Sequence, residues 1–262
     1  MRVLLAGAGG TIGRVLCEGL AGRGHEVVGL DLVPAPEGVT GAWHVADCAD
    51  PDAVAAVFAE ETLDAVLHFA GIPGERGLAE SLTSHAVTTA ALLEAMVAHR
   101  VTRIVYASSN HAVGRTPRQG LLTVDHRPRP DTFYGVGKVA AEALLSLYAD
   151  RHGLDAVSCR IGSFTETPQN VRALSTWLSP ADCVRMAEAA LTAPAPGYAV
   201  VYGISANTRA WWDLEPGRRL GYEPQDDAET YAGEVQAAEG DEEAAAHVGG
   251  PFAARSFEIP AF

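Results

Sequence analysis

Tyr134 and Lys138 stand four residues apart in the segment Tyr-Gly-Val-Gly-Lys. In a helix this spacing places both side chains on one face. A free tyrosine ionises near pH ~10 and is a poor base at neutral pH. A lysine cation beside the phenol favours the phenolate and lowers the tyrosine pKa. The pair therefore predicts a general base or acid that works near pH ~7.

Ser108 and Ser109 follow an apolar run, residues 103–107, that has the character of a buried strand. In open parallel sheets, ligands bind outside the carboxyl ends of the strands, and the helix that Tyr134 begins starts at the same edge. A serine hydroxyl there can bind the reacting oxygen and hold it against the phenol. We predict Ser109, Tyr134 and Lys138 as catalytic residues; the alternative is a turn serine and a core tyrosine.

A glycine-rich loop, Gly7-Ala8-Gly9-Gly10-Thr11-Ile12-Gly13, comes directly after the first apolar run and opens a helical pattern. Gly7, Gly10 and Gly13 allow a tight turn, close approach of a pyrophosphate, and close packing of helix on strand. The phosphates would lie on the helix N-terminus beside Thr11 and Ile12, where backbone N–H groups are unpaired. We predict a dinucleotide site; a glycine turn that serves packing alone is the alternative.

Three further strand ends complete the predicted cofactor site. Asp31, about twenty residues after the loop, would accept bonds from the ribose hydroxyls and repel a 2′-phosphate, which favours NAD over NADP. Asp47 ends the third strand and either contacts the adenine or serves as a helix N-terminal turn residue. Ala70 and Gly71 are small residues that would let the cofactor lie across the sheet.

The rest of the chain alternates apolar runs with helical patterns, which predicts an α/β doubly wound parallel sheet, a Rossmann fold. Residues 1–262 would form one domain, to which 164–178 and 204–262 contribute a small C-terminal substrate lobe. The acidic segment 226–246 favours a solvated helix surface. Predicted strands span residues 2–6, 26–30, 42–45, 64–69, 103–107, 156–161 and 198–202, and the main helices span 11–23, 78–99, 131–152 and 179–192.

Composition narrows the function classes. The chain has 262 residues, 48% of them hydrophobic and 20% charged, and a formal net charge of −14. That charge argues against a nucleic-acid or anionic membrane partner, and an anionic substrate would need a local positive pocket. Four widely spaced cysteines predict neither a metal site nor a disulfide framework, which suits a reducing cytoplasm. We expect no signal peptide and no membrane span.

These motifs together resemble the extended short-chain dehydrogenase/reductase superfamily, the NAD-dependent epimerase/dehydratase-like proteins. The closer likeness is to the uronate dehydrogenases, and it covers nearly the whole chain. It rests on the segments Ser108-Ser109-Asn110-His111, Tyr134-Gly-Val-Gly-Lys138, Arg160-Ile161-Gly162-Ser163, Arg172-Ala173-Leu174-Ser175-Thr176-Trp177, Gly203-Ile204-Ser205-Ala206-Asn207 and Trp211-Trp212-Asp213.

The resemblance implies oxidation of D-glucuronate or D-galacturonate at C1 by NAD+, with an aldarolactone as product. Tyr134 would be the base, and Lys138 would also bind the nicotinamide ribose. The implied substrate contacts are Ser109, Asn110, His111, Tyr134, Ser163, Arg172 and Phe252. Arg172 can bind a carboxylate as a planar fork, or it is a surface residue. His111 can equally be structural, and Arg160 is expected to be structural. A homo-oligomer follows by analogy only.

Two positions depart from the family pattern. Pro73 stands where the family tends to carry a substrate-contacting serine, and His85 lies near the position of a common asparagine. Both departures bear on substrate preference rather than on the oxidation machinery. Two other functions stay open: a nucleotide-sugar epimerase or dehydratase, and a non-catalytic protein that senses the dinucleotide.

Overall fold

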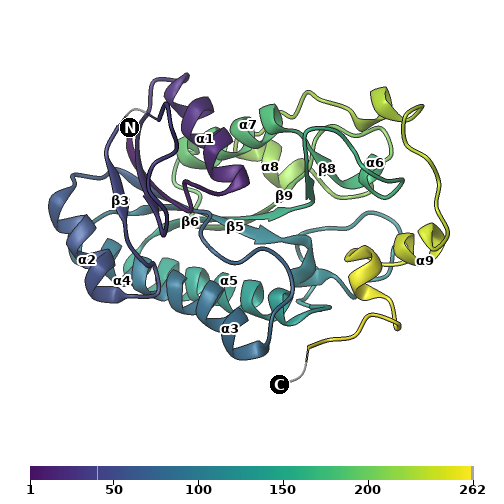
Figure 1. Cartoon of the computed structure of the whole chain (residues 1–262), viewed down its shortest axis with the longest axis horizontal. Helices are drawn as coiled ribbons and strands as arrows, with labels where there is room; N and C mark the ends of the chain where they lie inside the picture. Colours follow the sequence, from purple (N-terminus) through teal and green to yellow (C-terminus); the bar gives the residue numbers. More distant parts are fainter. Residues whose placement is uncertain (40, 261–262) are drawn as a thin grey trace.

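The computed structural model describes residues 1–39 and 41–260. A seven-stranded parallel sheet runs through the molecule in the order β3-β2-β1-β4-β5-β6-β9 (Figure 1). Every predicted strand is present, to within two residues at each end, and the α/β doubly wound fold is confirmed. The strands are β1 (Arg2–Ala6), β2 (Glu26–Asp31), β3 (Trp43–Val45), β4 (Ala65–His68), β5 (Arg103–Ser109), β6 (Asp155–Ile161) and β9 (Tyr198–Gly203).

Helices cover both faces of the sheet, as parallel strands require. In Figure 1, α1, α7 and α8 lie above the sheet, and α2, α3, α4 and α5 lie below it. Their bounds are α1 (Thr11–Ala21), α2 (Pro51–Glu60), α3 (Leu78–Leu82), α4 (Thr88–His99), α5 (Phe133–His152), α7 (Pro180–Thr192) and α8 (Glu215–Arg219). Within residues 1–39 and 41–260, we find no helix with both the length and the apolar character that a bilayer crossing demands.

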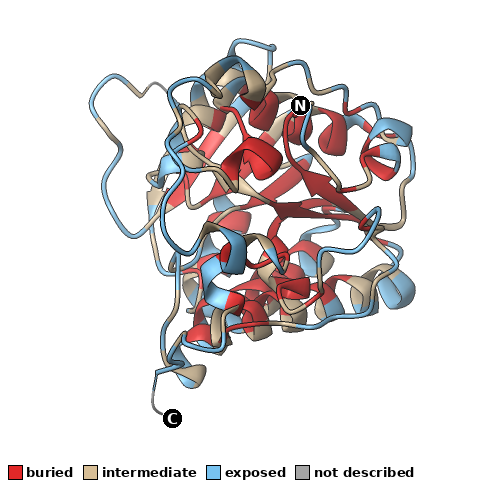
Figure 2. Cartoon of the chain, turned by 90° about the vertical axis from the view of Figure 1, so that its right-hand side faces the viewer, coloured by how far each residue is buried: buried red, intermediate tan, exposed pale blue. Residues whose placement is uncertain are grey.

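The core lies in two layers, one on each face of the sheet (Figure 2). Side chains alternate along a strand, so Val3 and Leu5 of β1 face one layer while Leu4 and Ala6 face the other. This alternation explains why the strand sequences are continuously apolar.

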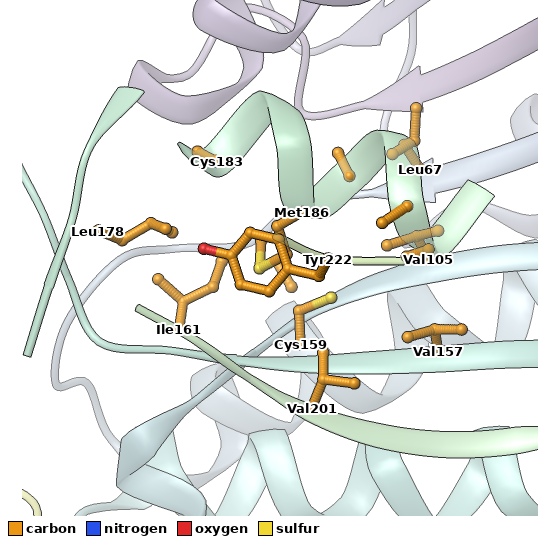
Figure 3. Packing of buried hydrophobic residues seen from close by; sticks show 14 of the residues in the cluster. Leu67, Val105, Val157, Cys159, Ile161, Leu178, Cys183, Met186, Val201 and Tyr222 are labelled. Carbon is orange, nitrogen blue, oxygen red and sulfur yellow. The ribbon is translucent and has the colours of Figure 1, made fainter. Parts of the chain in front are cut away.

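The C-terminal part of the chain is anchored to the upper core layer by Tyr222. Its ring lies among Met186, Cys159 and Ile161 (Figure 3). Its hydroxyl donates a hydrogen bond of 2.8 Å to the carbonyl of Ile204, which satisfies the polar end of a buried side chain. The segment after β9 is thereby held against the sheet.

The predicted long helix over 78–99 is interrupted. Between α3 and α4 the chain forms a π-helical turn, η1 (Thr83–Val87). The hydroxyl of Thr88 binds the carbonyl of Ser84 and that of Thr89 binds the carbonyl of His85, and both contacts compete with regular helix bonds. Such turns are frequent at functional sites, and this one carries His85 to the edge of the crevice described below.

The predicted helical surface over 226–246 is wrong. The segment holds two single turns, η3 (Ala228–Tyr231) and α9 (Asp241–Ala245), separated by irregular chain. Asp227 accepts N–H bonds from Thr208 and Glu229 at 2.8 and 3.0 Å. Its carboxylate therefore fixes a loop and a helix cap instead of lining a solvated helix face.

The remaining short elements lie around the carboxyl ends of β5 and β6. They are η2 (Asn110–Val113), β7 (Ser163–Phe164), α6 (Ala173–Thr176), β8 (Trp177–Leu178) and η4 (Gly250–Ala253). The C-terminal segment, yellow in Figure 1, runs down the right-hand side of the molecule. The division into a main domain and a small substrate lobe stays a prediction, and residues 261–262 of that lobe lie outside the described residues.

Candidate active site

Three adjoining cavities follow the carboxyl ends of the strands. The large cavity, about 600 Å³, extends from the glycine loop to Phe69–Pro73. The middle cavity, about 200 Å³, shares Phe69–Pro73 with it and continues to Ser109 and Tyr134. The outer cavity, about 170 Å³, shares Ser109, Tyr134 and Gly162 with the middle one. The shared walls make one continuous crevice, with room for an extended ligand and a small second molecule.

The glycine loop is shaped by the approach of its backbone to β4. Gly7 has φ +86°, and a Cβ there would lie 2.5 Å from the backbone nitrogen of Ala70. A Cβ on Gly13 would lie 2.1 Å from the carbonyl oxygen of Gly7, so Gly13 serves helix–strand packing and does not line the crevice. Gly7 and Gly10 line the large cavity, Ile12 lines the middle one, and Thr11 is the first residue of α1.

The N-terminus of α1 differs from those of α2, α5 and α7, the other long helices that begin after a loop. Asp50 caps α2, Thr132 caps α5 and Ser179 caps α7 through side-chain hydrogen bonds. Gly10 begins α1 with no side-chain cap. An uncapped helix end beside a cavity of this size fits the pyrophosphate of a dinucleotide, because its first N–H groups remain free to bind an anion.

Asp31 and Asp47 both line the large cavity. Asp31 Oδ2 accepts the N–H of Gly9 at 2.8 Å, so this carboxylate also holds the glycine loop in place. Asp47 Oδ1 accepts the N–H of Ala49 at 2.8 Å. Asp47 thus makes the turn contact that was predicted as its alternative role. It also lines the cavity in which the adenine contact is predicted. Ala70 and Gly71 line the large and middle cavities, as the cofactor prediction requires.

Tyr134, Lys138 and Ser109 meet in the middle cavity. Thr132 caps α5 by accepting the N–H of Gly135 at 2.9 Å, which places Tyr134 in the first turn of the helix. Lys138 Nζ lies 5.4 Å from the centre of the Tyr134 ring and donates a hydrogen bond of 2.6 Å to the carbonyl of Ala107. The structure therefore brings together the three residues that the sequence predicted as catalytic.

The predicted lowering of the tyrosine pKa by Lys138 needs correction. Burial raises the pKa of Tyr134 to about 12, against a smaller lowering by the Ser109 hydroxyl. Burial lowers the pKa of Lys138 to about 7, and the Glu142 carboxylate opposes that change. Desolvation of both groups outweighs their mutual attraction here. The pair still loses one proton near pH 7, and this proton comes from the amine in place of the phenol.

A buried network lies beneath this pair. Glu142, one helical turn after Lys138, accepts a hydrogen bond of 2.5 Å from the Ser108 hydroxyl. The same carboxylate binds Arg160 through two bonds of 2.9 and 2.8 Å. Arg160 is thus structural, as predicted from its strand-end position. Glu142 was missed by the sequence reading, although its place four residues after Lys138 on the same helix face was an available signal.

The outer cavity is lined by Asn110, His111 and Phe252 together with Ser109 and Tyr134. The His111 ring contacts those of Tyr134 and Phe252 edge to face, at centroid distances of 5.7 and 5.1 Å. His111 Nδ1 lies 3.0 Å from both carboxylate oxygens of Asp131, which fixes the orientation of the ring. Phe252 is 39% exposed and forms part of the rim.

Ser163 and Arg172, both in the described part of the chain, do not line these three cavities. Arg172 Nη2 donates 2.6 Å to the carbonyl of Val248, and its Nη1 lies 3.2 Å from Ser163 Oγ. Asn110 Nδ2 donates to the same Val248 carbonyl at 3.2 Å. The guanidinium is thus linked to Asn110 of the outer cavity through the carbonyl of Val248, and together with Val248 it lines a separate small cavity.

Glu75 and Thr132 also line the outer cavity, and the sequence analysis predicted neither of them. Glu75 lies in the loop after β4, where no periodic pattern marks a functional side chain.

The two positions that depart from the family pattern both line the crevice. Pro73 lines the large and middle cavities, where it has no hydroxyl with which to contact a ligand. His85 is 2% exposed, lines the middle cavity and has its ring centre 4.9 Å from that of Tyr134. Burial and Lys138 lower its pKa to about 2, so it is neutral.

Comparison with known proteins shows which family this chain belongs to. The family model described as "NAD dependent epimerase/dehydratase family" matches residues 3–197. The chain belongs to the NAD dependent epimerase/dehydratase family. A uronate dehydrogenase of Pseudomonas syringae pv. tomato is 38% identical over 97% of this chain and 93% of its own length.

Two solved structures are similar along the whole chain. A mutant uronate dehydrogenase from Agrobacterium tumefaciens complexed with NAD is 36% identical, with a TM-score of 0.90 and 99% of both chains covered. A glucuronic acid dehydrogenase from Chromohalobacter salexigens is 36% identical, with a TM-score of 0.89 and 96% of both chains covered. The predicted family, the Rossmann fold and NAD as cofactor are confirmed.

Proposed function

We propose that this chain oxidises a hexuronate, D-glucuronate or D-galacturonate, at C1 with NAD+ to give the aldarolactone. The relatives that match nearly the whole chain are named for this activity. The crevice supports it, since a dinucleotide-sized cavity meets a small outer cavity at Ser109 and Tyr134.

The observation that carries the choice of a uronate is Arg172. Arg172 is half-buried, and desolvation lowers its pKa to about 10 against an opposing effect of the Asp131 carboxylate, so it keeps its charge at neutral pH. None of the ion pairs among residues 1–39 and 41–260 includes it. A partly desolvated cation that forms no ion pair is costly unless an anion binds there. In our proposal the substrate carboxylate replaces the Val248 carbonyl as its partner, with Ser163 and Asn110 beside it.

The residues of the crevice then divide the chemistry. NAD+ bound across the large and middle cavities would accept the hydride from C1. Ser109 orients the anomeric hydroxyl, and the phenol oxygen of Tyr134 takes the proton of that hydroxyl as the C1–O double bond forms. When the amine of Lys138 is neutral, the phenol of Tyr134 releases its own proton toward that amine as its oxygen takes the substrate proton, so the pair gains one proton while the hydride leaves for NAD+. Asn110, His111 and Phe252 hold the sugar ring.

An assay of NADH formation with uronates, neutral aldoses and UDP-sugars tests the proposal. Turnover of uronates well above that of neutral aldoses is the expected result. Interconversion of UDP-sugars without net NADH would favour the epimerase, and NAD+ binding without turnover of any sugar would favour a sensor. Either of these outcomes would overturn the proposed activity.

We further propose a homo-oligomer that works in a reducing cytoplasm, with residues 164–178 and 204–262 acting as the substrate lobe. Val87, beside α4, and Leu147 of α5 are exposed large hydrophobic residues on the lower layer of helices and suit a subunit contact. Light scattering after gel filtration would test the assembly, and a monomer at all concentrations would contradict it.

A further inference from the structure

The first turn of α5, which carries Tyr134, is held by a carboxylate from another part of the chain. Glu75 Oε1 accepts the N–H of Phe133 at 2.8 Å, and Oε2 accepts the N–H of Tyr134 at 3.0 Å. Thr132 takes the next N–H, that of Gly135. The first three N–H groups of the helix are thereby paired with side chains, a complete cap made by two separate segments.

Glu75 reaches α5 from the loop between β4 and α3. Gly74 has φ +93° and no atom within 4 Å of its Cβ position, so glycine is needed there for backbone conformation and not for space. Earlier in the same loop, the N–H of Ile72 is bound by Ser84 Oγ at 2.7 Å. The loop that lines the large and middle cavities is therefore attached to η1 on one side and to α5 on the other.

We infer that Glu75 is a positioning residue for Tyr134. Its carboxylate binds the backbone N–H of the very residue whose phenol faces the reacting oxygen, and it ties that residue to the loop along which NAD lies. Proton transfer depends on heavy-atom positions within a few tenths of an ångström, and a 1 Å misplacement can reduce a rate by ~100-fold. This inference rests on the proposed function, which makes Tyr134 the base.

The chain offers a matched control for the loss of a helix cap. Asp50 accepts the N–H groups of Asp52 and Ala53 at 3.0 and 3.2 Å, as Glu75 does at α5, and it does not line the crevice. Asp50→Ala and Glu75→Ala each remove a carboxylate with two N–H bonds at a helix N-terminus. Both should lower the unfolding temperature by a similar small amount.

The two variants should differ in turnover. We expect Glu75→Ala to lower kcat by ~10- to 100-fold with little change in KM for either substrate, whereas Asp50→Ala keeps kcat within about twofold of the wild type. Glu75→Gln retains an amide oxygen that can accept one of the two N–H bonds and should restore most of the rate. Equal kcat values for Glu75→Ala and Asp50→Ala would overturn the inference, as would a Gln variant no faster than the Ala variant.

A second measurement separates this inference from the proposed function. If the wild type turns over no sugar, the proposed function fails on its own. Amide hydrogen exchange in the segment that contains Phe133 and Tyr134 then reports the contact directly. Faster exchange there in Glu75→Ala, with no change in Asp50→Ala, supports the Glu75 contact, and unchanged exchange refutes it.

Discussion

The two ends of the crevice are built in different ways. At the large cavity, most of the lining comes from the glycine loop and from the ends of β2, β3 and β4, and the rest comes from α1 and from the helical segment α3–η1–α4. At the outer cavity, the lining comes from distant segments: Gly74–Glu75, Ser109–His111, Thr132, Tyr134, Gly162 and Phe252. In our proposal the first end binds the cofactor through a fold-encoded loop, and the second end binds the substrate through particular side chains.

This difference indicates which substitutions leave the fold intact. A residue of the outer cavity can change without disturbing the sheet, because it extends from a loop or a helix end. Pro73, which lines the large and middle cavities, shows the same freedom, since it lies in a loop and leaves the strands intact. The glycine loop has no such freedom, because a Cβ on Gly7 or Gly13 would meet backbone atoms.

The largest effect should come from the residue at which the two ends meet. Tyr134→Phe removes the phenol oxygen that takes the substrate proton, and we expect kcat to fall by ~10²- to 10⁴-fold. NAD+ binding, measured by calorimetry, should stay nearly unchanged, because the large cavity is intact. Tyr148→Phe, on the same helix and away from the crevice, is the control. A Tyr134→Phe enzyme with normal kcat would exclude the proposed base.

Arg172→Ala should affect the outer end alone. Loss of hydrogen bonds to a charged group costs ~1.5–3 kcal/mol, so KM for the uronate should rise by ~10- to 100-fold while KM for NAD+ stays constant. Arg209→Ala removes an exposed arginine that pairs with Glu229 at 2.6 Å and should change neither value. If residual turnover of a neutral aldose weakens as much as that of the uronate, Arg172 is structural and does not bind the carboxylate.

The dependence of kcat/KM on pH should report the Tyr134–Lys138 pair. The pKa of Lys138 is lowered to about 7, so the form with one fewer proton, which can accept a proton, is populated above that pH. We therefore expect kcat/KM to rise about tenfold per pH unit below this midpoint and to level off above it. Lys138→Arg keeps a cation at all pH values and should remove the rise in rate near pH ~7. A profile that is flat between pH ~5 and ~9 would contradict this titration.

The smallest effect should fall on cofactor choice. Asp31→Asn removes the charge that repels a 2′-phosphate but keeps an oxygen that can accept the N–H of Gly9. We expect the preference for NAD+ over NADP+ to narrow by roughly tenfold, with kcat unchanged, because the outer cavity is untouched. Initial rates with both cofactors measure this ratio. A wild type that already prefers NADP+ would contradict the assignment of Asp31.

Much of the fold could be predicted because its signals are local. Continuous apolar runs marked the seven strands, and the capping pattern at Ser179 marked the start of α7. One prediction failed and another was incomplete, because side-chain contacts competed with the regular pattern. The helix over 78–99 contains a π-helical turn, and the acidic segment 226–246 uses Asp227 to fix a loop. The Asp227 contact joins segments 19 residues apart, which the spacing of neighbouring residues does not encode.

The sequence by itself determined the candidate cofactor loop and the candidate catalytic pair, because Gly7 to Gly13 and Tyr134 to Lys138 are short motifs whose spacing carries their geometry. Only the tertiary structure decided the protonation of that pair, since burial of both groups depends on the whole domain. It also decided that Arg172 binds the carbonyl of Val248 and that Glu75 reaches Tyr134 from 59 residues away. Contacts between distant segments depend on how the chain packs, and no local pattern specifies them.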